Sequence, residues 1–111
     1  MDNKQIVEAL SGVFYIATVE GDQPHVRPFD KAAEVDGVLY IGTARTKKVF
    51  NQILNNPKVE IFAMNDFGIC RFTAEASPEE DESKVRKAFE IMKKPFDEEN
   101  SVALRLDSIG F

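Results

Sequence analysis

The chain has 111 residues, of which 43% are hydrophobic, and this is enough for one domain with a core of its own. Its 19 acidic residues outnumber its 14 basic ones, so nucleic acid is not the expected partner. The single cysteine excludes an internal disulfide and a cysteine-rich metal site, and the lack of a signal peptide or of a run of roughly 20 apolar residues predicts a cytoplasmic protein without a membrane partner.

The elements predicted along the chain are short strands, mostly joined by tight turns, with helices between them. Apolar residues at helical spacing predict an opening helix that starts behind Asp2 or Asn3 and ends at Ser11. Runs of β-branched and aromatic residues predict strands, and Asp36-Gly37 is the strongest hairpin signal between them. The predicted strands cover residues 13–19, 25–29, 31–35, 38–43, 59–64, 69–76 and 102–106.

Two further helices are predicted, each with its own start signal. The first has Thr46 as its expected N-cap and ends before Pro57. The second is expected to start at the capping-box pattern Ser77-Pro78-Glu79-Glu80, with proline in the first helical position. The expected apolar face of the first consists of Val49, Phe50, Ile53 and Leu54.

The second predicted strand differs from the others because it contains two prolines. Pro24 and Pro28 cannot donate to a neighbouring strand, so this strand should lie at an edge of the sheet or where the sheet opens. Six or seven antiparallel strands with about three short helices predict a mainly β (α+β) fold, a small closed or split barrel, forming a single domain over residues 1–111.

A basic stretch joins the fourth predicted strand to the second predicted helix. Arg45, Lys47 and Lys48 lie there with two hydroxyl groups, those of Thr43 and Thr46. A helix start presents free N–H groups and the positive end of the helix dipole, where cations are unfavourable unless an anion is bound. A Walker loop is excluded because Thr46 stands where that motif needs glycine. The pattern predicts a bound terminal phosphate, and the alternative is a hydrated lysine-rich helix start.

Other residues that could carry chemistry give weaker signals. Arg27, on the proline-flanked strand, is a candidate contact for a flat polar ligand, although surface arginines usually have no specific task. His25, the only histidine, is predicted to be a surface residue rather than a proton donor or metal ligand, and Cys70 a small buried hydrophobe rather than a nucleophile. Core or dimer contacts, rather than stacking on a cofactor, are predicted for Phe62, Phe67 and Phe72.

Three segments, in this order and spacing, resemble a known family. They are residues 14–29, FYIATVEGDQPHVRPF, residues 39–49, LYIGTARTKKV, and residues 56–60, NPKVE. The chain is similar in them to the pyridoxamine 5'-phosphate oxidase-like family of FMN-binding split barrels. The resemblance is good over residues 5–76 and loose over the remainder.

The resemblance implies FMN as the cofactor. In that family the arginine of the second strand and the residues after it contact the flavin, while the threonine that closes the fourth strand and the basic residues that open the next helix hold the phosphate. Arg45 has no firm counterpart there, and it enters with Thr46 from the phosphate argument alone. The candidate cofactor-binding residues are Arg27, Pro28, Phe29, Thr43, Arg45, Thr46, Lys47 and Lys48.

The family resemblance also implies a homodimer with two flavins at the interface, so that part of each site comes from the other chain. The expected function is an oxidoreductase that passes electrons through the flavin N5 atom from a reduced nicotinamide or another small-molecule donor to an unidentified small acceptor. No acid or base residue is predicted. The alternatives are a non-catalytic protein that stores or senses FMN, deazaflavin or haem, and a structural or regulatory domain that has lost its ligand.

The sequence also departs from true pyridoxamine 5'-phosphate oxidases. Those enzymes carry a longer carboxyl-terminal segment with a tryptophan and arginine signature around the substrate phosphate. This chain has no tryptophan and ends with residues 105–111, RLDSIGF. Oxidation of vitamin B6 is therefore not the expected activity, and a general flavoprotein of the family is.

Overall fold

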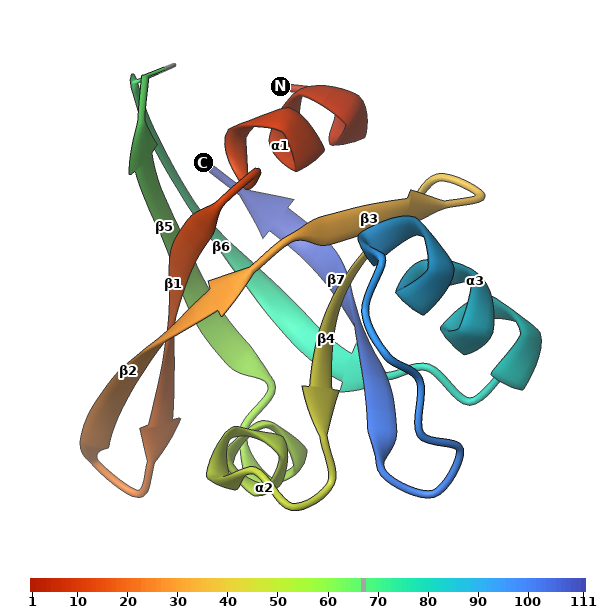
Figure 1. The fold of residues 1–111 in the computed structure, drawn as a ribbon. Coiled ribbons are helices and arrows are strands. Elements are labelled where there is room, and N and C mark those ends of the chain that lie inside the picture. The colour runs from red at the N-terminus through yellow and green to blue at the C-terminus, as the bar shows by residue number, and fades with distance from the viewer. Residues whose placement is uncertain (67) are drawn as a thin grey trace.

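A computed structural model of the protein describes residues 1–66 and 68–111, in which three helices accompany one seven-stranded sheet (Figure 1). Phe67, expected to be a core or dimer contact, lies outside the described residues. The predicted mainly β, antiparallel fold with three short helices is confirmed. The elements are α1 (Asn3–Ala9), β1 (Val13–Glu20), β2 (Gln23–Asp30), β3 (Ala32–Val35), β4 (Val38–Ala44), α2 (Lys48–Asn55), β5 (Lys58–Asn65), β6 (Gly68–Pro78), α3 (Glu82–Met92) and β7 (Ser101–Gly110).

The sheet has the strand order β2-β1-β5-β6-β7-β4-β3, and every neighbouring pair is antiparallel. β2 is therefore an edge strand, as its prolines predicted. Lys31 alone separates β2 from β3, the strand at the opposite edge, so the sheet bends until its two edges meet. Away from this junction β2 and β4 diverge, and α2 lies near their lower ends (Figure 1). The barrel is split at that place.

The main core fills the inside of the bent sheet. Alternate residues of each strand point inward, as with Phe14 and Ile16 on β1 and Ile61 on β5, all of them fully buried. A second cluster lies outside the barrel, where α3 packs Phe89 and Met92 against Tyr40 and the neighbouring strands. The buried residues of α3, which recur at helical spacing, therefore form a core-facing side that packs on the outside of β3 and β4.

Two signals in the local sequence, a helix cap and a hairpin turn, are confirmed. Asp2 caps α1, since its carboxylate accepts from the Gln5 backbone N–H at 2.8 Å while the Gln5 side chain accepts from the Asp2 N–H. Asp36 and Gly37 turn β3 into β4 with φ values of 50° and 82°, the two positive values of the expected hairpin turn. Local chemistry is therefore a good guide where no distant strand competes.

The predicted start of the third helix is wrong. Ser77 and Pro78 belong to β6, where they pair with Arg105 and Leu104 of β7, and this long-range pairing keeps the chain extended. The helix instead begins after Asp81, whose carboxylate accepts from the Ser83 backbone N–H at 3.0 Å.

The predicted apolar face of α2 is also partly wrong. Leu54 is 53% exposed, whereas Gln52 is buried with 4% exposure. The remaining predicted positions of that face, Val49, Phe50 and Ile53, are buried. Of the helices formed by residues 1–66 and 68–111, none has the length and apolar character needed to span a bilayer.

Candidate functional site

A hollow of about 490 Å³ lies at the split of the barrel, between β2, β4 and the start of α2. Its walls come from parts of the chain that are distant in sequence and meet because the sheet edges come together. Six of the eight predicted site residues line this hollow: Arg27, Pro28, Phe29, Thr43, Lys47 and Lys48. The structure therefore brings the two parts of the predicted site, on β2 and at the β4–α2 junction, to one place.

The start of α2 differs from the prediction. The N-cap residue is Lys47 rather than Thr46, because the Lys47 N–H closes a turn onto the Ala44 carbonyl at 3.0 Å and the helix begins only at Lys48. No side chain caps this helix. Its first N–H groups thus lie beside the lysines that line the hollow, without a side-chain acceptor.

Arg45 and Thr46 do not line the hollow. The Arg45 guanidinium lies over the Phe50 ring, 5.6 Å from its centroid, and borders a separate depression with Glu79 and Glu80. Thr46 is exposed to solvent. Both residues therefore lie outside the lining of the hollow that Lys47 and Lys48 border.

Arg27 points from β2 toward the inside of the barrel. Its Nη1 donates to the Ile16 carbonyl at 3.1 Å and to Thr18 Oγ1 at 2.9 Å, and its Nη2 donates to Gln52 Oε1 at 2.5 Å. Burial lowers the pKa of the Arg27 guanidinium below its ordinary value. Within residues 1–66 and 68–111 no carboxylate forms an ion pair with it.

Lys94, which no sequence motif indicated, also lines the hollow. Lys93, the C-cap residue that follows α3, has the left-handed conformation with φ of 57°, and the chain then directs Lys94 toward β2. There Lys94 Nζ lies 2.5 Å from Asp30 Oδ1, and the hydrogen bond and charge of this lysine lower the pKa of the Asp30 carboxyl. Only the path of the chain after α3 makes this contact, so a local pattern does not reveal it.

Gly42 explains how α3 comes so close to the hollow. A Cβ atom at this position would lie 3.3 Å from Met92 Cε and 3.3 Å from Phe89 Cζ, which is tighter than ordinary packing. The absence of a side chain at Gly42 therefore lets the end of α3, and Lys94 after it, approach β4.

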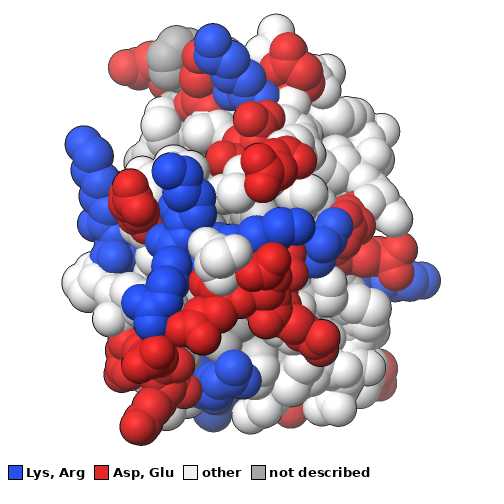
Figure 2. Space-filling model, turned by 90° about the vertical axis from the view of Figure 1, so that its right-hand side faces the viewer, with Lys and Arg blue, Asp and Glu red and all other residues white. Residues whose placement is uncertain are grey.

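The lining of the hollow is strongly cationic. Among the residues that the structure describes, it carries Arg27, Lys47, Lys48 and Lys94 but only one carboxylate, that of Asp30, in a protein whose net charge is −5. The face that carries α3 is different, since its blue basic side chains lie among red acidic ones (Figure 2). A local excess of positive charge in a concave site is suited to an anionic ligand.

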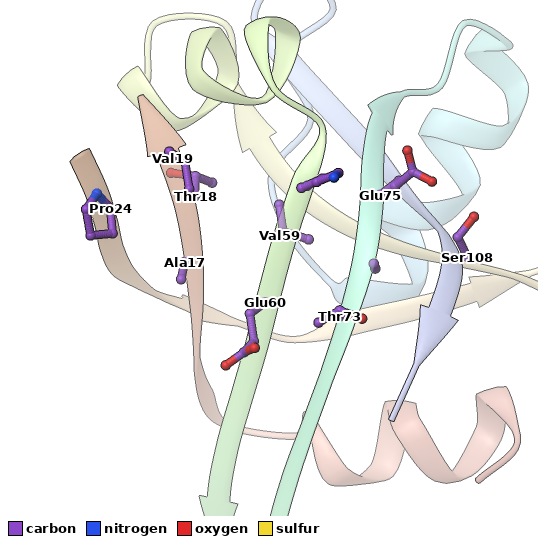
Figure 3. A pocket seen from close by; sticks show the side chains of 11 residues that line it. Ala17, Thr18, Val19, Pro24, Val59, Glu60, Thr73, Glu75 and Ser108 are labelled. Carbon is purple, nitrogen blue, oxygen red and sulfur yellow. The ribbon is translucent and has the colours of Figure 1, made fainter. Parts of the chain in front are cut away.

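A second hollow of about 530 Å³ has a different character. It lies on the outside of the sheet, over β1, β5 and β6, where Glu60 and Glu75 project around it (Figure 3). Lys58 is its only cationic lining residue among those that the structure describes. It is slightly larger than the hollow at the barrel split, but its acidic lining does not suit a phosphate.

His25, Cys70, Phe62 and Phe72 are not among the residues that line the hollow at the barrel split. His25 is half-buried on β2, with Nε2 3.4 Å from Glu20 Oε1, and the described part of the chain holds no cluster of metal-ligating side chains. Cys70 is buried, and burial raises the pKa of its thiol, which confirms the expected hydrophobic role. Phe72 lies in the core as predicted, and the Phe62 ring lies 5.4 Å from the Arg71 guanidinium.

Several solved structures are similar to this chain. A NimC/NimA family protein from Clostridium acetobutylicum is 38% identical, with a TM-score of 0.83 over 93% of this chain and 76% of that one. The general stress protein 26 from Bacillus anthracis, 24% identical, and an FAD-binding protein from Mesorhizobium loti, 18% identical, share the fold. Their TM-scores are 0.68 and 0.64, over 98% and 93% of this chain and 92% and 83% of theirs. A comparison with curated proteins gives no match.

A comparison with protein families agrees with the sequence motifs. Residues 3–107 match the family described as "Pyridoxamine 5'-phosphate oxidase", a range that begins with α1 and reaches into β7. Since this match covers nearly the whole chain, the protein belongs to the pyridoxamine 5'-phosphate oxidase family.

Proposed function

We propose that the hollow at the barrel split binds FMN. The observation that carries this proposal is the grouping of Arg27, Lys47 and Lys48 around one concavity of an acidic protein. The phosphate would lie at the start of α2, beside the two lysines and the uncapped N–H groups. The ring system would extend toward Arg27, Pro28 and Phe29 on β2.

The residues present fit such a ligand. The volume of about 490 Å³ falls within the range of roughly 300–1,000 Å³ that is typical of cofactor sites. The Thr43 hydroxyl adds a neutral donor, and Phe29 adds an apolar wall. When bound, the isoalloxazine ring would supply the oxidation–reduction chemistry, and the protein would supply binding, orientation and electrostatics.

The activity that this site supports best is electron transfer between a small-molecule donor, such as a reduced nicotinamide, and a small acceptor. The one carboxylate among the described lining residues, Asp30, is already paired with Lys94. The lining therefore offers no evident acid or base, which suits chemistry done by the cofactor. The same observation also suits a second candidate function, a carrier that binds the flavin without turnover.

A homodimer is part of the proposal, with the cofactor at the interface and part of each site supplied by the partner. The outer face of β1, β2, β5 and β6 supports it by exposing Val13, Tyr15, Val26, Met64 and Ile69. Exposed apolar surface is typical of protein–protein interaction sites, which supports the proposed interface. Replacement of Val26 by Asp should give a monomer in sedimentation, and an unchanged dimer would contradict this interface. The free thiol of Cys70 fits the cytoplasmic location predicted from the sequence.

The deciding experiment begins with the absorption spectrum of the purified protein and a titration with FMN. A flavin spectrum, or saturable uptake of added FMN, supports the proposal, whereas a Soret band would indicate haem. A colourless protein that binds no FMN would overturn it. Anaerobic mixing of the loaded protein with NADH or NADPH then separates the two candidates, because an enzyme using such a donor bleaches and a carrier does not.

A further inference from the structure

Gln52 is a polar side chain in the core-facing surface of α2. It is 4% exposed, and its neighbours on that face are apolar. Burying an amide is costly unless it is hydrogen-bonded, so its place in the core requires an explanation beyond packing. Gln52 Oε1 accepts from Thr18 Oγ1 at 2.7 Å and from Arg27 Nη2 at 2.5 Å, and Thr18 is itself 1% exposed. The two buried groups thus form a neutral support for one arginine.

The same contacts leave part of Arg27 available. A guanidinium has five N–H donors, and the structure satisfies three of them, two on Nη1 and one on Nη2. The Nε–H and the second N–H of Nη2 have no acceptor in the described part of the chain, and the side chain lines the hollow. All three acceptors are neutral oxygens, so the positive charge of Arg27 is held in place without being compensated.

We infer that Gln52 and Thr18 are positioning residues that hold the Arg27 guanidinium in place. In this position two of its N–H donors and its uncompensated positive charge face the edge of a planar ligand, where two adjacent atoms accept hydrogen bonds. An isoalloxazine ring has such edges, each formed by a ring nitrogen and a neighbouring carbonyl oxygen. The identity of this ligand rests on the proposed function. The placement of Arg27 rests only on the contacts among these three residues.

An amide suits this task better than a carboxylate. A glutamate at position 52 would also hold Arg27, but it would pair with the guanidinium and compensate the charge intended for the ligand. A leucine would fill the same space without accepting a hydrogen bond from Arg27. Comparison of the two variants therefore separates the effect of immobilising the Arg27 side chain from the effect of its uncompensated charge.

The first test uses the protein without cofactor. Nitrogen-15 NMR of the arginine side chains should show restricted rotation of the Arg27 guanidinium in the wild type and in Gln52→Glu, and averaged Nη signals in Gln52→Leu. Ile53→Val is the matched control, because Ile53 is buried on the same helix and does not line the hollow. Equal mobility of Arg27 in the wild type and Gln52→Leu would overturn the inference, whatever the protein binds.

The second test measures affinity for FMN and for riboflavin, which lacks the phosphate. Gln52→Leu should weaken binding of both about tenfold, the factor expected when one well-placed charge-assisted hydrogen bond is lost. Gln52→Glu should weaken both although Arg27 remains ordered. Thr18→Val should weaken both less, and Ile53→Val should change neither.

If the wild type binds FMN and Gln52→Leu binds it equally well, the positioning role is wrong while the proposed function stands. If the wild type binds neither flavin, the proposed function fails, and the NMR result alone decides the placement of Arg27.

Discussion

The hollow at the barrel split and the face that carries α3 use the same kinds of charged side chain in opposite ways. On the α3 face Arg86 is paired twice, with Glu82 at 2.8 Å and with Glu98 at 2.7 Å. In the hollow Arg27 has only neutral acceptors. Exposed ion pairs contribute little to stability and are common on solvated surfaces. A cation held without a carboxylate in a concave site is less expected, and it supports the ligand site proposed above.

One cation of the hollow, Lys94, is paired, since it forms an ion pair with Asp30. A similar pairing occurs near α3, where Arg105 contacts Asp107 at 3.0 Å and Glu79 at 3.4 Å. If this difference between paired and unpaired cations reflects ligand binding, substitution of the unpaired cations should weaken binding. Substitution of the paired groups should change the free energy of unfolding and have little effect on binding. Five substitutions, at four places in the molecule, test this expectation.

The largest effect is expected at the start of α2. Lys47→Ala and Lys48→Ala should each weaken FMN binding by about 1.5 to 3 kcal/mol, because each removes a charge-assisted contact with the phosphate. Riboflavin binding should change little. Isothermal titration measures both, with the exposed Lys87→Ala on α3 as the control. Unchanged FMN affinity would show that this cationic helix start has no role in binding.

The next effect is expected at Tyr40, which is fully buried below α3 and donates to Glu79 Oε1 at 2.5 Å. Tyr40→Phe should lower the free energy of unfolding by about 1 to 2 kcal/mol and leave FMN affinity unchanged. Burial and the Glu79 carboxylate raise the pKa of Tyr40 to about 12, above its unfolded value of 10.0. The tyrosine contribution is therefore complete below pH 10 and lost as the pH rises toward 12. Alkaline unfolding and ultraviolet titration of both proteins check this, and a phenol that titrates normally would contradict it.

A third effect concerns acid stability. The Tyr40 hydroxyl, with further help from the Asp81 N–H and Arg105, lowers the pKa of Glu79 below its ordinary 4.5. Its ionised form is thus favoured by folding, and this contribution is present above pH 4.5 and lost as the pH falls through the folded pKa. Unfolding by urea at pH values from about 6 to 3 should show a smaller loss of stability in Glu79→Gln than in the wild type. Parallel curves would show that Glu79 does not contribute to the pH dependence.

The smallest effect is expected from Asp30→Asn. This change removes the one carboxylate from the described lining of the hollow and releases Lys94, so FMN binding should become tighter by less than about 1 kcal/mol. Stability should change by a similarly small amount. Glu60→Gln, on the outer face, is the matched control. Weaker FMN binding in Asp30→Asn would mean that Asp30 itself contacts the ligand.

Sequence reasoning located the elements because their signals are local. The Asp36-Gly37 turn, the Asp2 cap and the prolines of β2 each act within a few residues, and each is confirmed. The same reasoning failed at Pro78, where pairing with Leu104 of β7 overrides a good helix-start pattern. Boundaries that depend on a distant strand are not written in the local sequence.

The site was predicted in the same uneven way. The motif residues Arg27, Lys47 and Lys48 meet at one hollow, whereas Arg45 lies outside its lining. Lys94 was missed because only tertiary packing brings it to β2. Gln52 was missed for another reason, since a buried amide among apolar residues is recognised only when its partners on other elements are known.

The length of the link between β1 and β2 determines which side chains of β2 face the hollow. Glu20 pairs with Gln23, so only two residues separate the strands, and this register sets Arg27 opposite Ile16. Neighbouring side chains of a strand face opposite ways, so one inserted residue would turn the arginine outward and Val26 inward. A relative that keeps the arginine but has one more residue in this link should not bind flavin, unless a β-bulge restores the original alternation of side chains on β2. Link length is thus as informative as the motif itself when cofactor binding is judged across the family.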